Sequence, residues 1–306
     1  MKKKTTLGDL IKLKPFRNLE AEINELENNK RTFISDKEAW NKKTEELNEE
    51  LVDKKKKLDF QISLIADFMH EQGKINQKFL ENSQLLMDTC QTLPLDKDEI
   101  EKEIRLINNT SLTLKALSEL SRTRMDMMEY LFNRDVLISA DPKRFNLWAL
   151  VEKLYKSLNG GAGENKKTFN MEGTSNKLYN THIILPVAIF IILENAYKYT
   201  IPEERIDINF VEKNDKLSIS FTNWGPSIKY NEINKLTERE YRGESAKKKY
   251  PNNGKGLGLS IMKDILDICE VKYYIEVGEG EKIYEGIEYK PFIVTLFFNN
   301  MMDSKY

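Results

Sequence analysis

The sequence predicts an α+β protein in which a long N-terminal coiled coil and helical hairpin precede an α/β-sandwich domain. Residues 17–93 contain no proline and one glycine, and their apolar residues recur three and four positions apart among charges. Residues 133–147 interrupt this pattern and read as a linker. Beyond them, helical segments mix with short segments rich in β-branched and aromatic residues, which is typical of strands packed on helices.

The N-terminal part predicts two long helices joined by a short turn. In the first helix, apolar residues follow steps of four, three and four at Leu58, Ile62, Ile65 and Met69. Pro94 ends this helix, and Asp96 or Asp98 can cap the next one, which runs to about residue 131. A lone hairpin would leave wide apolar stripes in water, whereas two hairpins form a four-helix bundle. We therefore expect a homodimer.

The expected domains are a coiled-coil input segment at 1–54, a helical hairpin at 55–136 and the sandwich at 145–300. Within the sandwich we expect helices at 146–158 and 180–199, with a Gly-rich loop at 159–167. The expected strands, mostly connected by hairpins, cover 168–173, 205–212, 216–223, 272–278 and 292–298.

Composition excludes several classes of function. The chain has 306 residues and a net charge of -1, so no field for binding nucleic acid is expected. Cys90 and Cys269 lie far apart without metal spacing, which indicates reduced thiols and a cytoplasmic location. The longest apolar run, 183–193, is too short to span a bilayer and contains Pro186, and the N-terminus lacks a signal-peptide pattern. We expect a soluble protein.

The stretch "GKGLGL" at 254–259 indicates a phosphate site. Gly254, Gly256 and Gly258 alternate just before an apolar helical segment. Glycines leave backbone N–H groups uncovered, and the start of a helix adds unpaired N–H groups and a positive dipole end. The spacing fits neither a P-loop nor a dinucleotide-binding loop.

Two further stretches could complete a nucleotide site. In "LENAYKYT" (193–200), Asn195 and Lys198 are neighbours on one helix face, and Tyr199 supplies a flat ring. An amide oxygen can ligate a hard cation, and a lysine can meet phosphate. In "FTNWGPSI" (221–228), Asn223 could pair with an exocyclic amine, and Gly225 would let a ring approach the backbone.

These three stretches, in this order, resemble the N, G1 and G2 boxes of the ATP-binding domain of sensor histidine kinases, a GHKL or Bergerat fold. Residues 233–259, with "YRG" at 241–243, resemble the ATP lid of that family. The resemblance covers about 145–300. It implies ATP and Mg²⁺ as cofactors, with Asn195 as the magnesium ligand.

The resemblance also implies a role for each residue of these stretches. Lys198 would contact phosphate and Tyr199 would pack on adenine. Asn223 stands where the family usually has Asp, and its carbonyl oxygen can still accept a bond from the adenine amine. The remaining nucleotide contacts would come from Gly225, Arg242, Gly254, Lys255, Gly256, Leu257 and Gly258.

The choice between hydrolysis and transfer depends on Ile191. ATPase branches of the superfamily place a Glu four residues before the asparagine of the N box, and an isoleucine cannot act as a base. Transfer to another group is therefore favoured over transfer to water.

Two histidines are candidates for the phosphoacceptor. His182 lies in the segment that would bind the nucleotide, so we expect a structural role for it. His70, in the first hairpin helix, is followed by Glu71, and in sensor kinases an acid after the acceptor helps to take its proton. Lys74 stands where kinases with phosphatase activity tend to carry Thr or Asn, so that activity stays open.

Two functions follow. The first is a histidine autokinase that phosphorylates His70 and passes the phosphoryl group to the aspartate of a response-regulator receiver domain, with a soluble or protein input partner at the coiled coil. The alternative is a non-catalytic scaffold or phosphorelay protein that acts through dimerisation and partner binding. Asn223 and the absence of the family's usual proline and arginine after His70 favour the alternative. The stimulus, the cognate regulator and the choice between cis and trans transfer stay open.

Overall fold

The computed structural model describes residues 14–32, 37–91, 97–139, 141–161, 167–251 and 255–299. The chain divides into two compact units, Met1–Asn76 and Gln77–Tyr306. The units are described separately below. None of the helices in the described ranges is long and apolar enough to cross a membrane.

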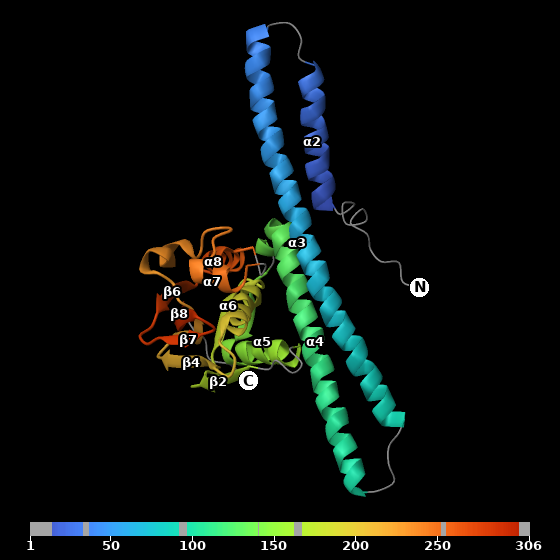
Figure 1. Ribbon diagram of the computed structural model, residues 1–306, viewed down its shortest axis with the longest axis vertical. Helices are drawn as coiled ribbons and strands as arrows, with labels where there is room; N and C mark the ends of the chain where they lie inside the picture. Colours follow the sequence, from blue (N-terminus) through green and yellow to red (C-terminus); the bar gives the residue numbers. More distant parts are fainter. Residues whose placement is uncertain are drawn as a thin grey trace. The chain divides into compact units, whose positions relative to one another are not determined.

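The first unit pairs two helices, α2 (Lys14–Thr32) and the N-terminal part of α3 (Lys37–Gln91) (Figure 1). Leu19 and Ile23 of α2 and Leu47 of α3 are buried. The polar pairs run in opposite directions along the two helices, which are therefore antiparallel: Glu22 with Lys54, Glu27 with Lys55 and Lys30 with Asn48. The predicted helical pattern of 17–93 is thus divided between two helices.

The second unit begins with the rest of α3 and with α4 (Lys97–Ile138). Residues 92–96, which contain Pro94 and the candidate cap Asp96, lie outside the described residues. The helix α4 continues to Ile138, so the segment expected to be linker from 133 is helical at its start. Pro142 and the short strand β1 (Lys143–Asn146) follow it.

The sandwich domain contains two sheets. In the smaller sheet, β1 pairs with β3 (Leu178–Thr181), and the two strands are antiparallel. The larger sheet has the order β2-β4-β5-β8-β6, with β7 paired to β8. Its strands are β2 (Thr168–Glu172), β4 (Arg205–Lys213), β5 (Lys216–Pro226), β6 (Lys272–Val277), β7 (Lys282–Tyr284) and β8 (Ile287–Phe298). All its pairs are antiparallel except β2 with β4, which is parallel.

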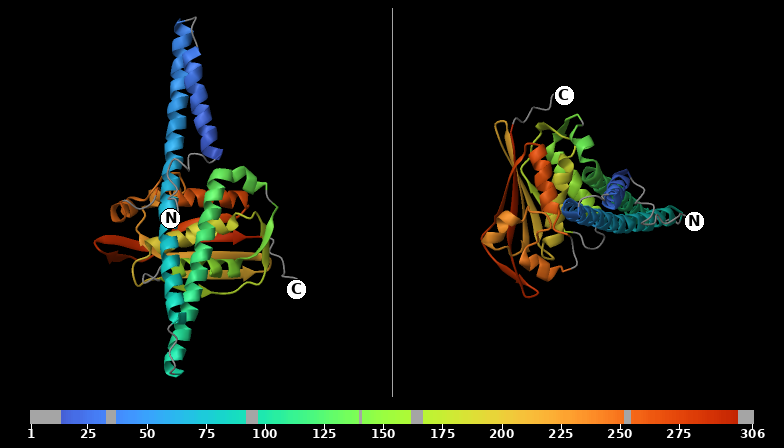
Figure 2. Two further views of the ribbon diagram at one scale, coloured as in Figure 1. Left: turned by 90° about the vertical axis from the view of Figure 1, so that its right-hand side faces the viewer. Right: turned by 90° about the horizontal axis from the view of Figure 1, so that it is seen from above.

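Helices cover one face of this sheet (Figure 2). They are α5 (Leu147–Gly161), α6 (Leu185–Tyr199) and α8 (Gly258–Ile268). Burial alternates along β5, where Leu217, Ile219 and Phe221 face the core. Their partners on α6 include Phe190, which is fully buried. The predicted α/β sandwich is confirmed. The remaining helices are short: η1 (Tyr230–Lys235) and α7 (Glu244–Lys249).

The segment 180–199 differs from the single helix expected there. Its first residues belong to β3, and α6 begins only at Leu185. Pro186 lies in the first turn of α6, where a missing N–H costs nothing and a fixed φ favours the helix. His182 lies between the strand and the helix, and its carbonyl accepts a hydrogen bond from the Leu185 N–H at 3.2 Å.

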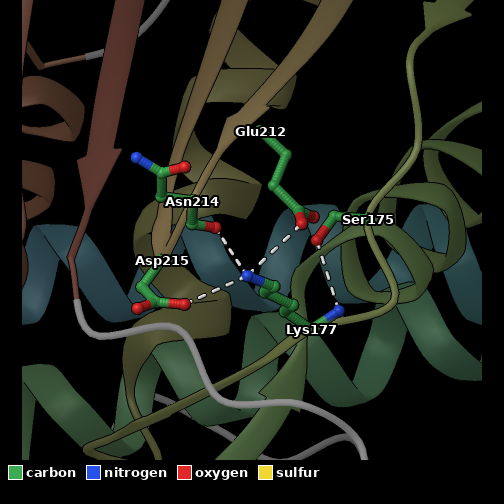
Figure 3. A network of polar contacts seen from close by, with 5 residues as sticks. All are labelled: Ser175, Lys177, Glu212, Asn214 and Asp215. Carbon is green, nitrogen blue, oxygen red and sulfur yellow. Dashed lines mark hydrogen bonds and ion pairs between the residues drawn. The ribbon is translucent and has the colours of Figure 1, made fainter.

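A lysine clamp fixes the turn between β4 and β5 (Figure 3). The Lys177 ammonium donates to the Asn214 carbonyl at 2.5 Å and to the Asp215 carboxylate at 3.2 Å. Glu212 lies 3.6 Å from the same ammonium, and the Lys177 N–H donates to Ser175 Oγ. This turn precedes β5, whereas Asn223 lies near the other end of that strand, so the clamp stabilises the sheet rather than the candidate site.

Candidate functional site

The helix α6 positions the first group of predicted site residues. Its apolar face is buried from Leu185 to Leu193, which leaves Asn195, Lys198 and Tyr199 half-buried at its C-terminal end. Thr200 ends the helix, with its N–H donating to the Ala196 carbonyl at 3.1 Å. The last turn of α6 therefore presents an amide, an ammonium and a ring at one edge of the domain.

The N-terminus of α8 lies against this turn. A Cβ atom added to Gly258, the first residue of α8, would lie 3.4 Å from Asn195 Nδ2 and 3.3 Å from Ile191 Cγ2. Helices α6 and α8 pack against each other along the core. Leu257 precedes α8 and cannot cap it through its side chain, so the first N–H groups of α8 are available to an anion beside Asn195.

The glycine loop before α8 also contacts the segment that begins the lid. Gly256 has a φ of +71°, and a Cβ on it would lie 2.5 Å from the Tyr241 carbonyl oxygen. Only glycine fits both this conformation and this close approach. Lys255 is half-buried in the same loop, whereas Gly254 lies outside the described residues.

The end of β5 forms the other side of the site. Asn223 is only 4% exposed, and a Cβ on Gly225 would lie 3.4 Å from its Nδ2. The Ile201 N–H, just after α6, donates to the Trp224 carbonyl at 3.3 Å. This bond joins the segment after α6 to β5, so the structure brings the three predicted stretches together.

Tyr199 and Arg242 have other partners. Lys198 Nζ lies 5.0 Å from the centroid of the Tyr199 ring, and the Tyr250 ring packs edge-to-face at 5.4 Å. Arg242 donates to the carbonyls of Tyr250 at 2.6 Å and Ala246 at 3.3 Å. Its guanidinium therefore binds backbone at the end of α7 in this structure, and the structure does not bring it to Asn195.

Glu232, just before the lid, is a residue that the sequence did not single out. It is 5% exposed, and its carboxylate accepts bonds from the Tyr241 hydroxyl at 2.8 Å and the N–H groups of Glu244 and Lys229, both at 3.0 Å. Burial raises its pKa, but these hydrogen bonds outweigh burial and hold the pKa below its ordinary value. Burial and the bond to Glu232 raise the pKa of Tyr241 to about 12. A sequence signal was available, because a Glu at the third position of a helix often bonds backbone at its start.

The two candidate phosphoacceptors differ in their surroundings. His70 is exposed on α3, and the carboxylate of the adjacent Glu71 pairs with Lys74 at 2.8 Å. His182 is half-buried, and its Nδ1 is buried with no hydrogen-bond partner among the described residues. His70 belongs to the first unit and Asn195 to the second.

The helix α4 binds the domain next to the site. Arg124 of α4 pairs with Glu194, the residue before Asn195, at 2.5 Å. Lys153 of α5 pairs with Glu119 of α4 at 2.8 Å. Because Glu194 is held by an arginine, its carboxylate is directed to α4 rather than to the N-terminus of α8.

The residues present fit a magnesium nucleotide. Gly258 leaves a space beside Asn195 that a Cβ would fill, and an amide oxygen suits Mg²⁺. Over the described ranges, no three His, Cys, Asp or Glu side chains cluster as a metal site.

Comparison with known proteins finds one matching family model and similar sensor proteins. The family of histidine kinase-, DNA gyrase B- and HSP90-like ATPases matches residues 183–290. The chain is 28% identical over 185 residues to the probable sensor protein PcoS of Escherichia coli, covering 60% of this chain and 38% of that protein. It is 32% identical over 103 residues to the sensor protein RprX of Bacteroides fragilis strain YCH46, covering 33% and 20%.

Solved structures with similar folds include two kinases. The mycobacterial sensor histidine kinase MprB is 15% identical with a TM-score of 0.44, covering 53% of this chain and 99% of that one. The catalytic domain of histidine kinase ThkA is 19% identical with a TM-score of 0.41, covering 53% and 98%.

The chain spans less than half the length of either sensor protein, 38% of PcoS and 20% of RprX. The region shared with the family, 183–290, contains the end of α6, the end of β5 and the start of α8 described above. The chain is similar to these sensor proteins, and its residues 183–290 match the family of histidine kinase-, DNA gyrase B- and HSP90-like ATPases.

Proposed function

We propose that this chain is an ATP-dependent histidine autokinase of a two-component signalling system, which phosphorylates His70 and passes the phosphoryl group to a response-regulator aspartate. One observation carries the proposal. The start of α8 lies directly against Asn195 at the end of α6, with a glycine at the point of contact. This juxtaposition gives a triphosphate unpaired N–H groups and an amide ligand for its magnesium on the same side.

The nucleotide is bound by residues at the ends of three elements. Asn195 holds Mg²⁺, which when bound neutralises charge on the phosphates. Lys198 and the first N–H groups of α8 bind phosphate oxygens, and Tyr199 packs on adenine. Asn223, which is buried at the end of β5, accepts a hydrogen bond from the adenine amine. Gly225 leaves room for the base.

The transfer step exchanges one bond for another. A lone-pair nitrogen of neutral His70 attacks the γ-phosphorus, the N–P bond forms, and the bond to the β–γ bridging oxygen breaks to release ADP. The imidazolium that results loses its other ring proton to Glu71. The Lys74 ammonium lies 2.8 Å from the Glu71 carboxylate on the same helix. A receiver aspartate then attacks the phosphorus, and the P–N bond breaks.

Two features support transfer over hydrolysis. Ile191 is 2% exposed and lies against Gly258, so the side chain beside the start of α8 has no group that can take a proton from water. Glu194 is paired with Arg124 of α4. No carboxylate of α6 therefore stands ready to activate a water beside Asn195 among the described residues.

We further propose that the chain acts as a homodimer. The end of α3 and the start of α4 expose large apolar side chains, including Leu80 at 70%, Met87 at 55% and Leu112 at 64%. Pairing two such hairpins would remove these side chains from water. The helices α2 and the first part of α3 would carry the signal of a soluble or protein partner, and the free thiols Cys90 and Cys269 favour a cytoplasmic location.

Autophosphorylation tests the proposal. We expect the purified chain with Mg²⁺ and γ-labelled ATP to acquire an acid-labile, base-stable label, and His70→Ala and Asn195→Ala to abolish it. His182→Ala is the matched control and should keep the label. Label that survives in His70→Ala would show that another residue is the acceptor. ATP binding without any label would instead favour a non-catalytic scaffold that binds nucleotide.

A further inference from the structure

The C-terminal end of α7 is tied to the hairpin of β7 and β8. Lys249, the last residue of α7, pairs with Glu285 in the turn between the two strands. Its ammonium also lies 5.2 Å from the centroid of the Tyr284 ring. The Lys249 side chain is only 16% exposed although its partner Glu285 is 59% exposed. The Lys249 side chain therefore packs against the hairpin rather than extending into water.

Tyr250, the next residue, faces the proposed nucleotide site. Its ring packs edge-to-face on Tyr199 with centroids 5.4 Å apart and planes at 70°. Tyr289 of the hairpin is 1% exposed, and its ring packs on that of Tyr284 with centroids 6.3 Å apart. Burial raises the pKa of the Tyr289 hydroxyl, and the neighbouring Tyr250 adds to this shift. Tyr250 thus packs on the ring at the end of α6.

The hairpin is fixed to the end of β5, close to Asn223. In the register of β5 and β8, Pro226 faces Tyr289 and Gly225 faces Lys290. Lys282 of β7 lies 4.2 Å from the Trp224 ring centroid and pairs with Glu204. The hairpin turn contains Glu285 and Gly286, both with positive φ, as in a tight two-residue turn. Such a hairpin is a rigid support for the lid.

Two groups already lie against the Tyr199 ring, the Lys198 ammonium and the Tyr250 ring. A base that packs on Tyr199 would compete with these two groups for contact with the ring. Lys198 lies on α6 itself and can turn to a phosphate, whereas Tyr250 is held from the hairpin. Resting on the proposed function, we propose that Tyr250 occupies the base position of the nucleotide site in the nucleotide-free chain and that the pair of the preceding Lys249 with Glu285 of the hairpin holds it there. Binding of ATP then requires this latch to open.

Nucleotide titration of variants tests the latch. We expect Tyr250→Ala to bind a non-hydrolysable ATP analogue with Mg²⁺ about two- to tenfold more tightly than the unchanged chain, because an aromatic contact no longer competes. Tyr250→Phe, which keeps the ring, should stay within about twofold. Tyr230→Ala, which removes a tyrosine that is 92% exposed at the start of η1, is the control and should change nothing.

Amide hydrogen exchange provides a second measurement, which reports on the end of α7 in the absence of nucleotide. In Glu285→Gln the pairing with Lys249 loses its charge, so amide hydrogen exchange over 244–250 should become faster, and nucleotide affinity should rise in the same direction as in Tyr250→Ala. Glu281→Gln is the matched control, since Glu281 is exposed before the same hairpin and has no ion pair among the described residues.

The outcomes separate the latch from the kinase proposal. Weaker binding by Tyr250→Ala would overturn the latch and make Tyr250 part of the wall that holds the base. Unchanged binding would also overturn it while leaving the proposed function intact. If the unchanged chain bound no analogue but Tyr250→Ala did, the latch would be supported. If no variant bound nucleotide, both proposals would fail together.

Discussion

Gly256 and Gly73 lie in different structural environments and therefore affect the stability of the fold differently. Gly256 combines a φ of +71° with a backbone contact that would bring a Cβ to 2.5 Å from the Tyr241 carbonyl oxygen. Gly73 lies exposed within α3, and a Cβ there would meet nothing within 4 Å. The first glycine is required by its place in the loop, whereas the second only lowers the stability of its helix.

Alanine at these two positions should therefore act in opposite directions. We expect Gly256→Ala to lower the free energy of unfolding by about 1–3 kcal/mol, because the alanine would adopt a strained φ and displace 240–241. Gly73→Ala should raise it by about 1 kcal/mol through helix propensity alone. Urea denaturation measures both. A stable Gly256→Ala variant would mean that the glycine loop does not pack on the lid as described.

The site residues that the sequence predicts are ones whose chemistry is local. Asn195, Tyr199 and Gly258 stand in short motifs, and the spacing of each motif already places the group on a helix end or a bare backbone. Tyr250 and Glu232 could not be found in this way. Their significance depends on rings and N–H groups that the fold brings from other segments, such as the Tyr199 ring for Tyr250 and the Glu244 N–H for Glu232.

At the scale of elements, the lid is anchored by a single carboxylate. Glu232 joins η1 to the start of α7, because Oε1 accepts from the Tyr241 hydroxyl and the Glu244 N–H while Oε2 accepts from the Lys229 N–H. A glutamine has one acceptor oxygen. Its NH₂ group would face the Lys229 N–H and leave one donor without a partner.

We expect Glu232→Gln to lower the free energy of unfolding by about 1–3 kcal/mol, the usual cost of an unsatisfied buried group. The pH dependence gives a second signature. Because the pKa of Glu232 is depressed in the folded chain, its contribution is fully present above the ordinary value of 4.5 and is lost as pH falls through the lower folded-state value. Denaturation between pH 6 and about pH 3 checks this, and Glu238→Gln, at an exposed site, is the control. Equal acid sensitivity in both variants would contradict the anchor.

The elements themselves were only partly predictable. The long strands β4, β5 and β8 carry alternating apolar residues, and the sequence marks them clearly. The short strands β1 and β3 have no such pattern, because each forms a strand only by pairing with the other. The parallel pairing of β2 with β4 is likewise invisible, since register between distant segments depends on the completed core.

At the scale of the whole molecule, the exposed apolar side chains of the hairpin make a prediction about assembly. Leu80 and Leu112, 70% and 64% exposed, lie on α3 and α4 within the second unit. Large apolar residues gathered on helices in this way mark an interaction surface rather than an ordinary solvated face. A second copy of the same hairpin offers the matching apolar surface.

We therefore expect the unchanged chain to sediment at about twice its mass of 35.8 kDa, and Leu80→Glu or Leu112→Glu to shift it toward the monomer. A carboxylate buried in an apolar interface would lose its hydration without gaining a partner, which costs several kcal/mol. We expect this cost to exceed the free energy that the remaining contacts contribute to dimerisation. Val211→Glu is the control, since Val211 is 61% exposed on β4 of the sandwich domain. A monomeric unchanged chain, or a dimer that Val211→Glu disrupts while both leucine variants keep it, would show that the hairpin is not the interface.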